Sequence, residues 1–167
     1  MDKSARRTAT VLAVLTILNL AVIWCSSLLS VEDSSRQSSF ITSILITLFG
    51  NADFDALEHI VRKCAHFSEF ASLGALSLGL TYTITKYDLR RTWSATALPA
   101  LGCLLSASTD ETIQIFANRG NSVSDVLLDF SGSVTAMCVF YIVVLIIRAK
   151  KRRDAPPEDG NTDICSV

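Results

Sequence analysis

The chain has 167 residues, of which 50% are hydrophobic, and its 15 lysine and arginine residues nearly balance its 16 aspartate and glutamate residues. This hydrophobic fraction is unusually high for a soluble domain of this size, so the composition argues against one and indicates an integral membrane protein. The length suits one compact helical unit, and we expect a single domain over residues 1–147.

A first apolar run covers residues 8–29 and follows three basic residues, Lys3, Arg6 and Arg7. Its roughly 22 residues are enough to cross a bilayer. A signal peptide shares the basic start, but its apolar core would be shorter and a small-residue cleavage pattern would follow it. We therefore expect a first transmembrane helix whose amino end lies in the cytoplasm.

The segment from Phe40 to Phe49 is also apolar, but it is too short to cross a bilayer. It predicts a short interfacial or re-entrant helix between the first and second spans. Asp53 or Asp55 can cap the next helix, and the spacing from Asp55 to Glu58 resembles a capping box.

The second predicted span, residues 56–85, begins with a polar stripe. At about 100° per residue its members fall within an arc of about 140°: Glu58, His59, Arg62, Lys63, His66 and Glu69. Ionisable groups at this depth are costly, so they imply partners or a function. Further along, small residues at Ala71, Gly74, Ala75 and Gly79 suit close contact between helices.

Two more spans are predicted at residues 93–116 and 124–147, and Pro99 is expected either to kink the first of them or to be absorbed locally. Each carries a polar arc at one end. The arcs consist of Ser106, Asp110, Glu111, Gln114 and Asn118, and of Ser122, Asp125, Asp129, Gly132, Ser133 and Ala136. Residues 148–167 are basic and then rich in polar residues, which predicts a disordered cytoplasmic tail.

The basic residues predict the orientation. Three precede the first span, three lie between the second and third, and five follow the fourth, which leaves only Arg36, Arg62, Lys63 and Arg119. The positive-inside rule places the three larger groups in the cytoplasm. The sequence thus predicts an all-α, integral membrane four-helix bundle with both termini inside the cell.

This orientation brings the three polar arcs to one depth near the outer surface. Carboxylates there are far less costly facing one another and water than facing lipid. We therefore predict one polar cavity, open to the outside, between the second, third and fourth spans, with the first span as scaffold. Its candidate residues are Arg62, Lys63, His66, Glu69, Asp110, Glu111, Gln114, Arg119, Ser122, Asp125 and Asp129.

Several of these residues also have structural interpretations. Arg62 or Lys63 can anchor the span at the interface, Asp125 can cap its helix, and Arg119 can pair with a carboxylate to lock the helices. His66 and Glu69 are suited either to proton transfer or to metal binding from one helix face. None of the five cysteines has metal-binding spacing, and the four in or beside apolar segments are interpreted as packing residues: Cys25, Cys64, Cys103 and Cys138.

At these residues the chain resembles the VanZ-like family of bacterial membrane proteins. The first motif is Arg62-Lys63-Cys64-Ala65-His66-Phe67-Ser68-Glu69-Phe70, followed by Leu73-Gly74. The second is Asp110-Glu111-x-x-Gln114-x-Phe116, followed by Arg119, Asp125-Val126, Asp129 and Gly132. One departure is Ile113, where many relatives carry a histidine. The resemblance implies a cell-envelope protein whose namesake is linked to resistance to teicoplanin-type glycopeptides.

Three functions remain open from the sequence. The first is binding of an envelope lipid, a lipid-linked cell-wall precursor or a glycopeptide antibiotic in the outer cavity. The second is a membrane enzyme acting on an envelope lipid, and the third is a small proton-coupled transporter. We expect membrane lipid as a partner and no nucleic acid, whereas the cofactor, any metal and the oligomeric state stay undetermined.

Overall fold

The computed structural model describes residues 2–28, 39–47, 53–85, 94–116 and 123–154, and all regular structure among them is helical. The long helices are α1 (Lys3–Leu28), α3 (Phe54–Ile84), α4 (Ser94–Phe116) and α5 (Val123–Arg153). A short helix covers residues 39–47, where the sequence predicts one. The all-helical class is therefore confirmed for the described residues.

Two of the long helices, α1 and α5, are long and apolar enough to cross a membrane. Both also expose large apolar side chains, such as Ile17 and Leu18 on α1 and Ile146 and Ile147 on α5. A soluble monomer rarely leaves such continuous apolar surface in water. Within the described residues, α3 and α4 are not among the helices that are long and apolar enough to cross a membrane. Both carry ionisable residues at one end. The predicted bundle of four spans is thus confirmed only in part.

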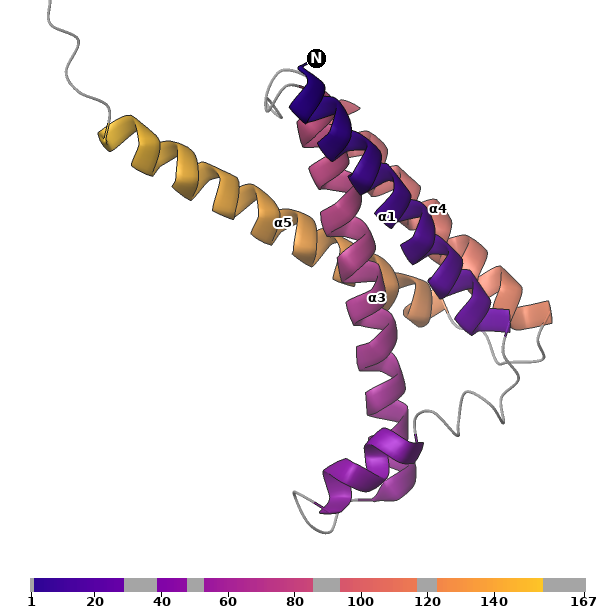
Figure 1. Cartoon of the computed structure of the whole chain (residues 1–167). Helices are drawn as coiled ribbons and strands as arrows, with labels where there is room; N and C mark the ends of the chain where they lie inside the picture. Colours follow the sequence, from indigo (N-terminus) through magenta and orange to yellow (C-terminus); the bar gives the residue numbers. More distant parts are fainter. Residues whose placement is uncertain (1, 29–38, 48–52, 86–93, 117–122, 155–167) are drawn as a thin grey trace, which may run out of the picture.

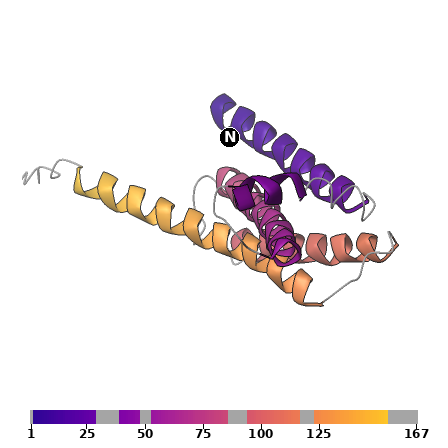
Figure 2. The same ribbon diagram turned by 90° about the horizontal axis from the view of Figure 1, so that it is seen from below.

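Helix α3 is central, because it packs against α1, α4 and α5 (Figure 1). Its contacts with α5 advance in the same direction along both helices: Lys63 meets Asp125, and Phe70 meets Ser133 further along. These two helices therefore run in the same general direction, although α5 crosses α3 obliquely (Figure 1). Helices α1 and α4 contact each other and share one direction, which is opposite to that of α3 and α5 (Figure 1). The carboxyl-terminal part of α5 extends away from the other helices (Figures 1 and 2).

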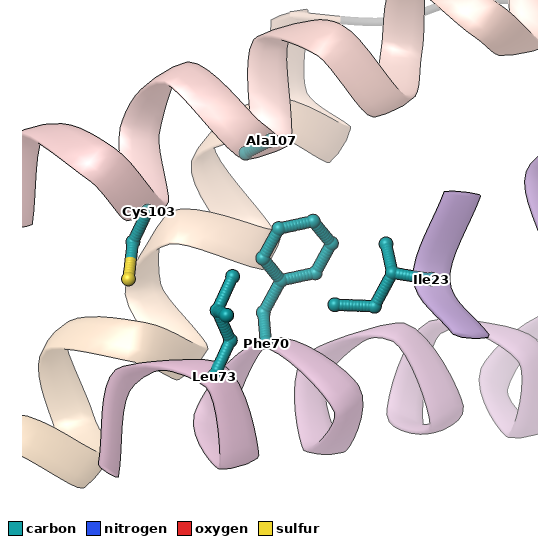
Figure 3. Close-up of a cluster of buried hydrophobic side chains, with 5 residues drawn as sticks. All are labelled: Ile23, Phe70, Leu73, Cys103 and Ala107. Carbon is teal, nitrogen blue, oxygen red and sulfur yellow. The ribbon is translucent and has the colours of Figure 1, made fainter. Parts of the chain in front are cut away.

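The hydrophobic core lies where α1, α3 and α4 converge. Figure 3 shows Phe70 and Leu73 of α3 pointing toward Ile23 of α1 and toward Cys103 and Ala107 of α4. All five side chains are almost completely buried. The core therefore fixes the spacing of three helices directly beside the polar residues of the sequence motifs.

Most predicted helix ends lie within two residues of the observed ones, but α1 begins at Lys3 instead of the predicted residue 8, and α5 ends at Arg153 instead of the predicted residue 147. Asp53 caps α3 by accepting a hydrogen bond from the backbone N–H of Asp55 at 3.2 Å, so the first of the two proposed caps is the one used. Helix α4 continues through Pro99. Helix α5 continues to Arg153, so residues 148–153, expected in the disordered tail, are helical; residues 155–167 lie outside the described part.

The cysteines differ from one another in environment. Cys103 is buried in the core, as predicted. Cys25, Cys64 and Cys138 are instead exposed free thiols on helix surfaces, so the prediction that they pack internally is wrong for these three. Helical spacing places each of them away from its helix's packed face, which an apolar residue type alone does not reveal.

Candidate functional site

The close packing of α3 on α5 depends on two glycines. A Cβ atom on Gly132 would lie 2.5 Å from the carbonyl oxygen of Phe67, and one on Gly74 would collide with the backbone of Ser133. The close approach lets the Ser133 hydroxyl donate to the carbonyl oxygen of Phe70 at 2.9 Å. The helix surfaces that carry the polar stripes are thereby held against each other.

Asp110 of α4 is the most buried ionisable residue of the site, with 0% exposure. Its two carboxylate oxygens accept hydrogen bonds from different helices: Ser27 Oγ of α1 donates at 2.5 Å, and Gln114 Nε2 of α4 donates at 2.9 Å. Two donors therefore fix the position of this carboxylate. The contact with Ser27 also makes α1 part of the site as well as scaffold.

His66, Asp110 and Asp129 converge from α3, α4 and α5. Nitrogen or oxygen atoms of the three side chains lie within 4.8 Å of one another. Asp129 is 2% exposed, and Glu69 Oε2 lies 3.9 Å from His66 Nδ1. Side chains far apart in the sequence thus form one compact group of nitrogen and oxygen atoms, which we call the buried triad (His66, Asp110 and Asp129) after its two buried carboxylates; His66 itself is partly exposed.

A more exposed ion pair lies closer to the helix ends. Lys63 Nζ of α3 is 2.8 Å from Asp125 Oδ1 of α5, and these side chains are 38% and 32% exposed. On α3 itself, Arg62 pairs with Glu58 at 3.1 Å. The site therefore has an outer, partly exposed pair of opposite charges and an inner, buried group of carboxylates.

The structure brings together most of the residues predicted from the two motifs. Lys63, Asp125 and the buried triad join three helices, and Glu69 contacts the triad at His66. Glu111 and Gln114 are also buried on α4. Arg119 and Ser122 lie outside the described residues, and an open cavity at this position stays a prediction.

Sequence analysis missed Ser27. Hydroxyl side chains are common in apolar helices because they can bond to their own backbone, as Ser26 does to the carbonyl oxygen of Ile23 at 2.7 Å. Nothing in the local sequence separates Ser26 from Ser27. Only the packing of α1 against α4 shows that the second of the two serines reaches Asp110.

Chemically, the inner group combines an imidazole with carboxylates, which are the side chains used for proton transfer and for binding divalent cations. The outer pair presents one ammonium and one carboxylate that are each accessible from solvent. The arrangement is suited to binding a polar ligand at the outer end and a cation at the inner end.

The fold and this site define a helical membrane protein with a polar, ionisable interior. A family model described as VanZ/LLP1 matches residues 12–146, which is nearly the whole chain. The chain therefore belongs to the VanZ-like family, as its two motifs predict. No curated protein matches it. No solved structure matches it either.

Proposed function

We propose that this protein crosses the bacterial cell membrane four times, with both termini in the cytoplasm. The alternating directions of α1, α3, α4 and α5 support this arrangement, as does the positive-inside distribution of lysine and arginine. Burial of Asp110 and Asp129 supports it too, because their charges then face other helices and not lipid. The polar site would lie near the outer leaflet.

We further propose that this outer site binds the charged headgroup of an envelope amphiphile: a lipid, a lipid-linked cell-wall precursor or a glycopeptide-type antibiotic. The observation that carries this proposal is the ion pair between Lys63 and Asp125, which joins two helices and stays about one-third exposed. A ligand lying in the outer leaflet would find a pair of opposite charges at the level of its own headgroup.

The exposed pair is suited to exchange with a ligand. Ion pairs that solvent can reach contribute only about 0–1 kcal/mol, so little energy is lost when Lys63 and Asp125 separate. The Lys63 ammonium would then bind a phosphate or carboxylate oxygen, and the Asp125 carboxylate would bind an amine. Teicoplanin-type glycopeptides and zwitterionic headgroups carry both kinds of group, so a role in resistance to such antibiotics is part of the proposal.

The test measures binding of a fluorescent lipoglycopeptide to full-length protein in phosphatidylcholine nanodiscs. Replacing Lys63 by Gln should weaken binding about tenfold or more, because a charged hydrogen bond contributes about 1.5–3 kcal/mol. Lys150→Gln serves as the matched control, since Lys150 lies in the last turn at the opposite end of α5. Phosphatidylglycerol is then added as a competitor to distinguish a lipid ligand from an antibiotic ligand.

Binding by the wild type and Lys150→Gln, with loss in Lys63→Gln, would support the headgroup site. Competition by phosphatidylglycerol would identify an anionic lipid headgroup as a ligand of the same site. Equal binding by the wild type, both variants and empty nanodiscs would overturn the proposal. Thermal unfolding of each variant checks that a lost signal does not come from a lost fold.

A further inference from the structure

The two carboxylates of the buried triad form no salt bridge with a lysine or arginine in the described part of the chain. The salt bridges between Lys or Arg and carboxylates in the described part of the chain join Lys63 to Asp125 and Arg62 to Glu58. Asp110 and Asp129 belong to neither of them. Two carboxylates buried this deeply, side by side, must share protons or be balanced by a positive charge.

The geometry of the triad matches the donor set of a metal ion. A first-row divalent ion holds nitrogen and oxygen ligands at about 2.0–2.2 Å, so neighbouring ligand atoms lie about 3–3.5 Å apart. The donor atoms of His66, Asp110 and Asp129 already lie within 4.8 Å of one another. Binding an ion there requires these atoms to approach one another by at most about 1–2 Å.

The surroundings of Asp110 resemble the outer shell of a metal site. Ser27 and Gln114 each donate to a different oxygen of this carboxylate, and outer hydrogen bonds of this kind orient ligands in metalloproteins. Each oxygen keeps a second lone pair for a metal. Both donors are neutral, so they orient the carboxylate but leave its charge to be balanced by something else.

Ser106 supplies an independent observation. Its side chain is only 5% exposed, and its buried hydroxyl oxygen has no hydrogen-bond partner in the described structure. It lies four residues before Asp110, so both are on the same face of α4. A buried hydroxyl without a protein partner is rare and calls for an explanation, of which a bound water or ion is one. An ion with bound water at the triad would place such a partner nearby.

We propose that His66, Asp110 and Asp129 bind one divalent transition-metal ion, with Glu69 as a further candidate ligand. One imidazole and two carboxylates are a mixed nitrogen and oxygen set. Imidazole favours Zn²⁺ and Fe²⁺ over Mg²⁺ and Ca²⁺, whereas carboxylates favour Mn²⁺. The ion balances the two buried carboxylate charges and joins α3, α4 and α5. This inference goes beyond the proposed headgroup site, since that site requires no metal.

The test uses full-length protein purified in detergent, stripped with chelator and then titrated with Zn²⁺ or Mn²⁺ alone. Bound metal is counted by mass spectrometry after desalting, and affinity is measured by calorimetry. The wild type should retain one metal ion per protein chain after desalting, and Asp129→Asn should retain none. Asp125→Asn is the matched control, because it removes a carboxylate from the same face of α5, one turn away, but outside the triad.

Ser27→Ala gives a second, independent measurement. This variant keeps all three ligands and loses only a donor to Asp110, so metal affinity should fall about 10–100-fold while the stoichiometry is unchanged. The protein should also unfold at a higher temperature with metal than without it, because an ion that binds only the folded state stabilises that state. That shift should disappear in Asp129→Asn.

Equal metal content in the wild type, Asp125→Asn and Asp129→Asn would mean that the metal binds adventitiously, and it would overturn the proposed metal site. Absence of metal from wild-type protein that unfolds cooperatively would overturn it as well and would leave proton sharing as the account of the buried carboxylates. Neither result bears on lipoglycopeptide binding at Lys63, so failure of the metal site and failure of the headgroup site can be told apart.

Discussion

Asp110 illustrates how one buried residue can connect several helices. Its carboxylate accepts hydrogen bonds from Ser27 of α1 and Gln114 of α4, and it lies beside His66 and Asp129. Inside a low-dielectric environment, a carboxylate oxygen that loses such a donor is left unsatisfied. The contact with Ser27 should therefore contribute to the stability of the whole bundle.

Replacing Ser27 by Ala should lower the free energy of unfolding by about 1–3 kcal/mol, because a hydrogen bond to a buried carboxylate is lost. Ser26→Ala is the neighbouring control, since the Ser26 hydroxyl bonds only to its own helix backbone. That substitution should change stability little. Unfolding is followed in mixed micelles with increasing denaturing detergent. Equal effects of the two substitutions would contradict the assigned role of Ser27.

At the residue scale, the sequence indicated which residues carry charge but not which of them meet. The helical spacing of His66, Asp110 and Asp129 predicted that they face other helices, because ionisable groups are too costly to face lipid, and Asp110 and Asp129 are indeed buried. The pairing of Lys63 with Asp125 could not be deduced in the same way. Several cations and carboxylates lie at similar depth, and only the rotation of each helix selects the partners.

At the scale of helices, the decisive feature is the close packing of α3 on α5. Gly74 and Gly132 permit it, since a side chain at either position would collide with the backbone of the facing helix. Small-residue spacing on α3 predicted close contact, although it could not say which helix would be the partner. The end of α5 was harder to predict, because the apolar pattern ends near residue 147 whereas the helix continues to Arg153. Basic residues in the last turn interact favourably with the helix dipole, so the helix can continue beyond its apolar part.

Gly74→Ala should destabilise the protein by about 1–3 kcal/mol, because the added methyl group forces α3 and α5 apart. Gly102→Ala is the control within α4: an added Cβ there meets nothing within 4 Å. It should be neutral or stabilising by at most about 1 kcal/mol, since alanine favours the helix. The same detergent titration measures both. Similar stability of the two variants would mean that α3 and α5 do not pack as closely as described.

At the scale of the whole molecule, the charged residues divide between the two ends of the helices. The motif ends of α3, α4 and α5 lie on the same side of the molecule as the carboxyl end of α1, and α3 extends beyond the other three (Figure 1). The basic residues of α5, from Arg148 to Arg153, lie at the other end of that helix. Charge asymmetry along the sequence could therefore predict the direction of each helix, although it could not predict how far α5 extends from its neighbours.

The proposed membrane orientation can be measured with thiol labelling. In a variant without native cysteines, Ser122→Cys should react in intact cells with a membrane-impermeant maleimide, because the loop between α4 and α5 is proposed to face outward. A second variant keeps Cys165 as its single cysteine and should react only after the membrane is permeabilised, because the carboxyl terminus is proposed to be cytoplasmic. The reverse pattern would place the polar site near the cytoplasm, where lipoglycopeptides have no access, and the proposed headgroup site would fail with it.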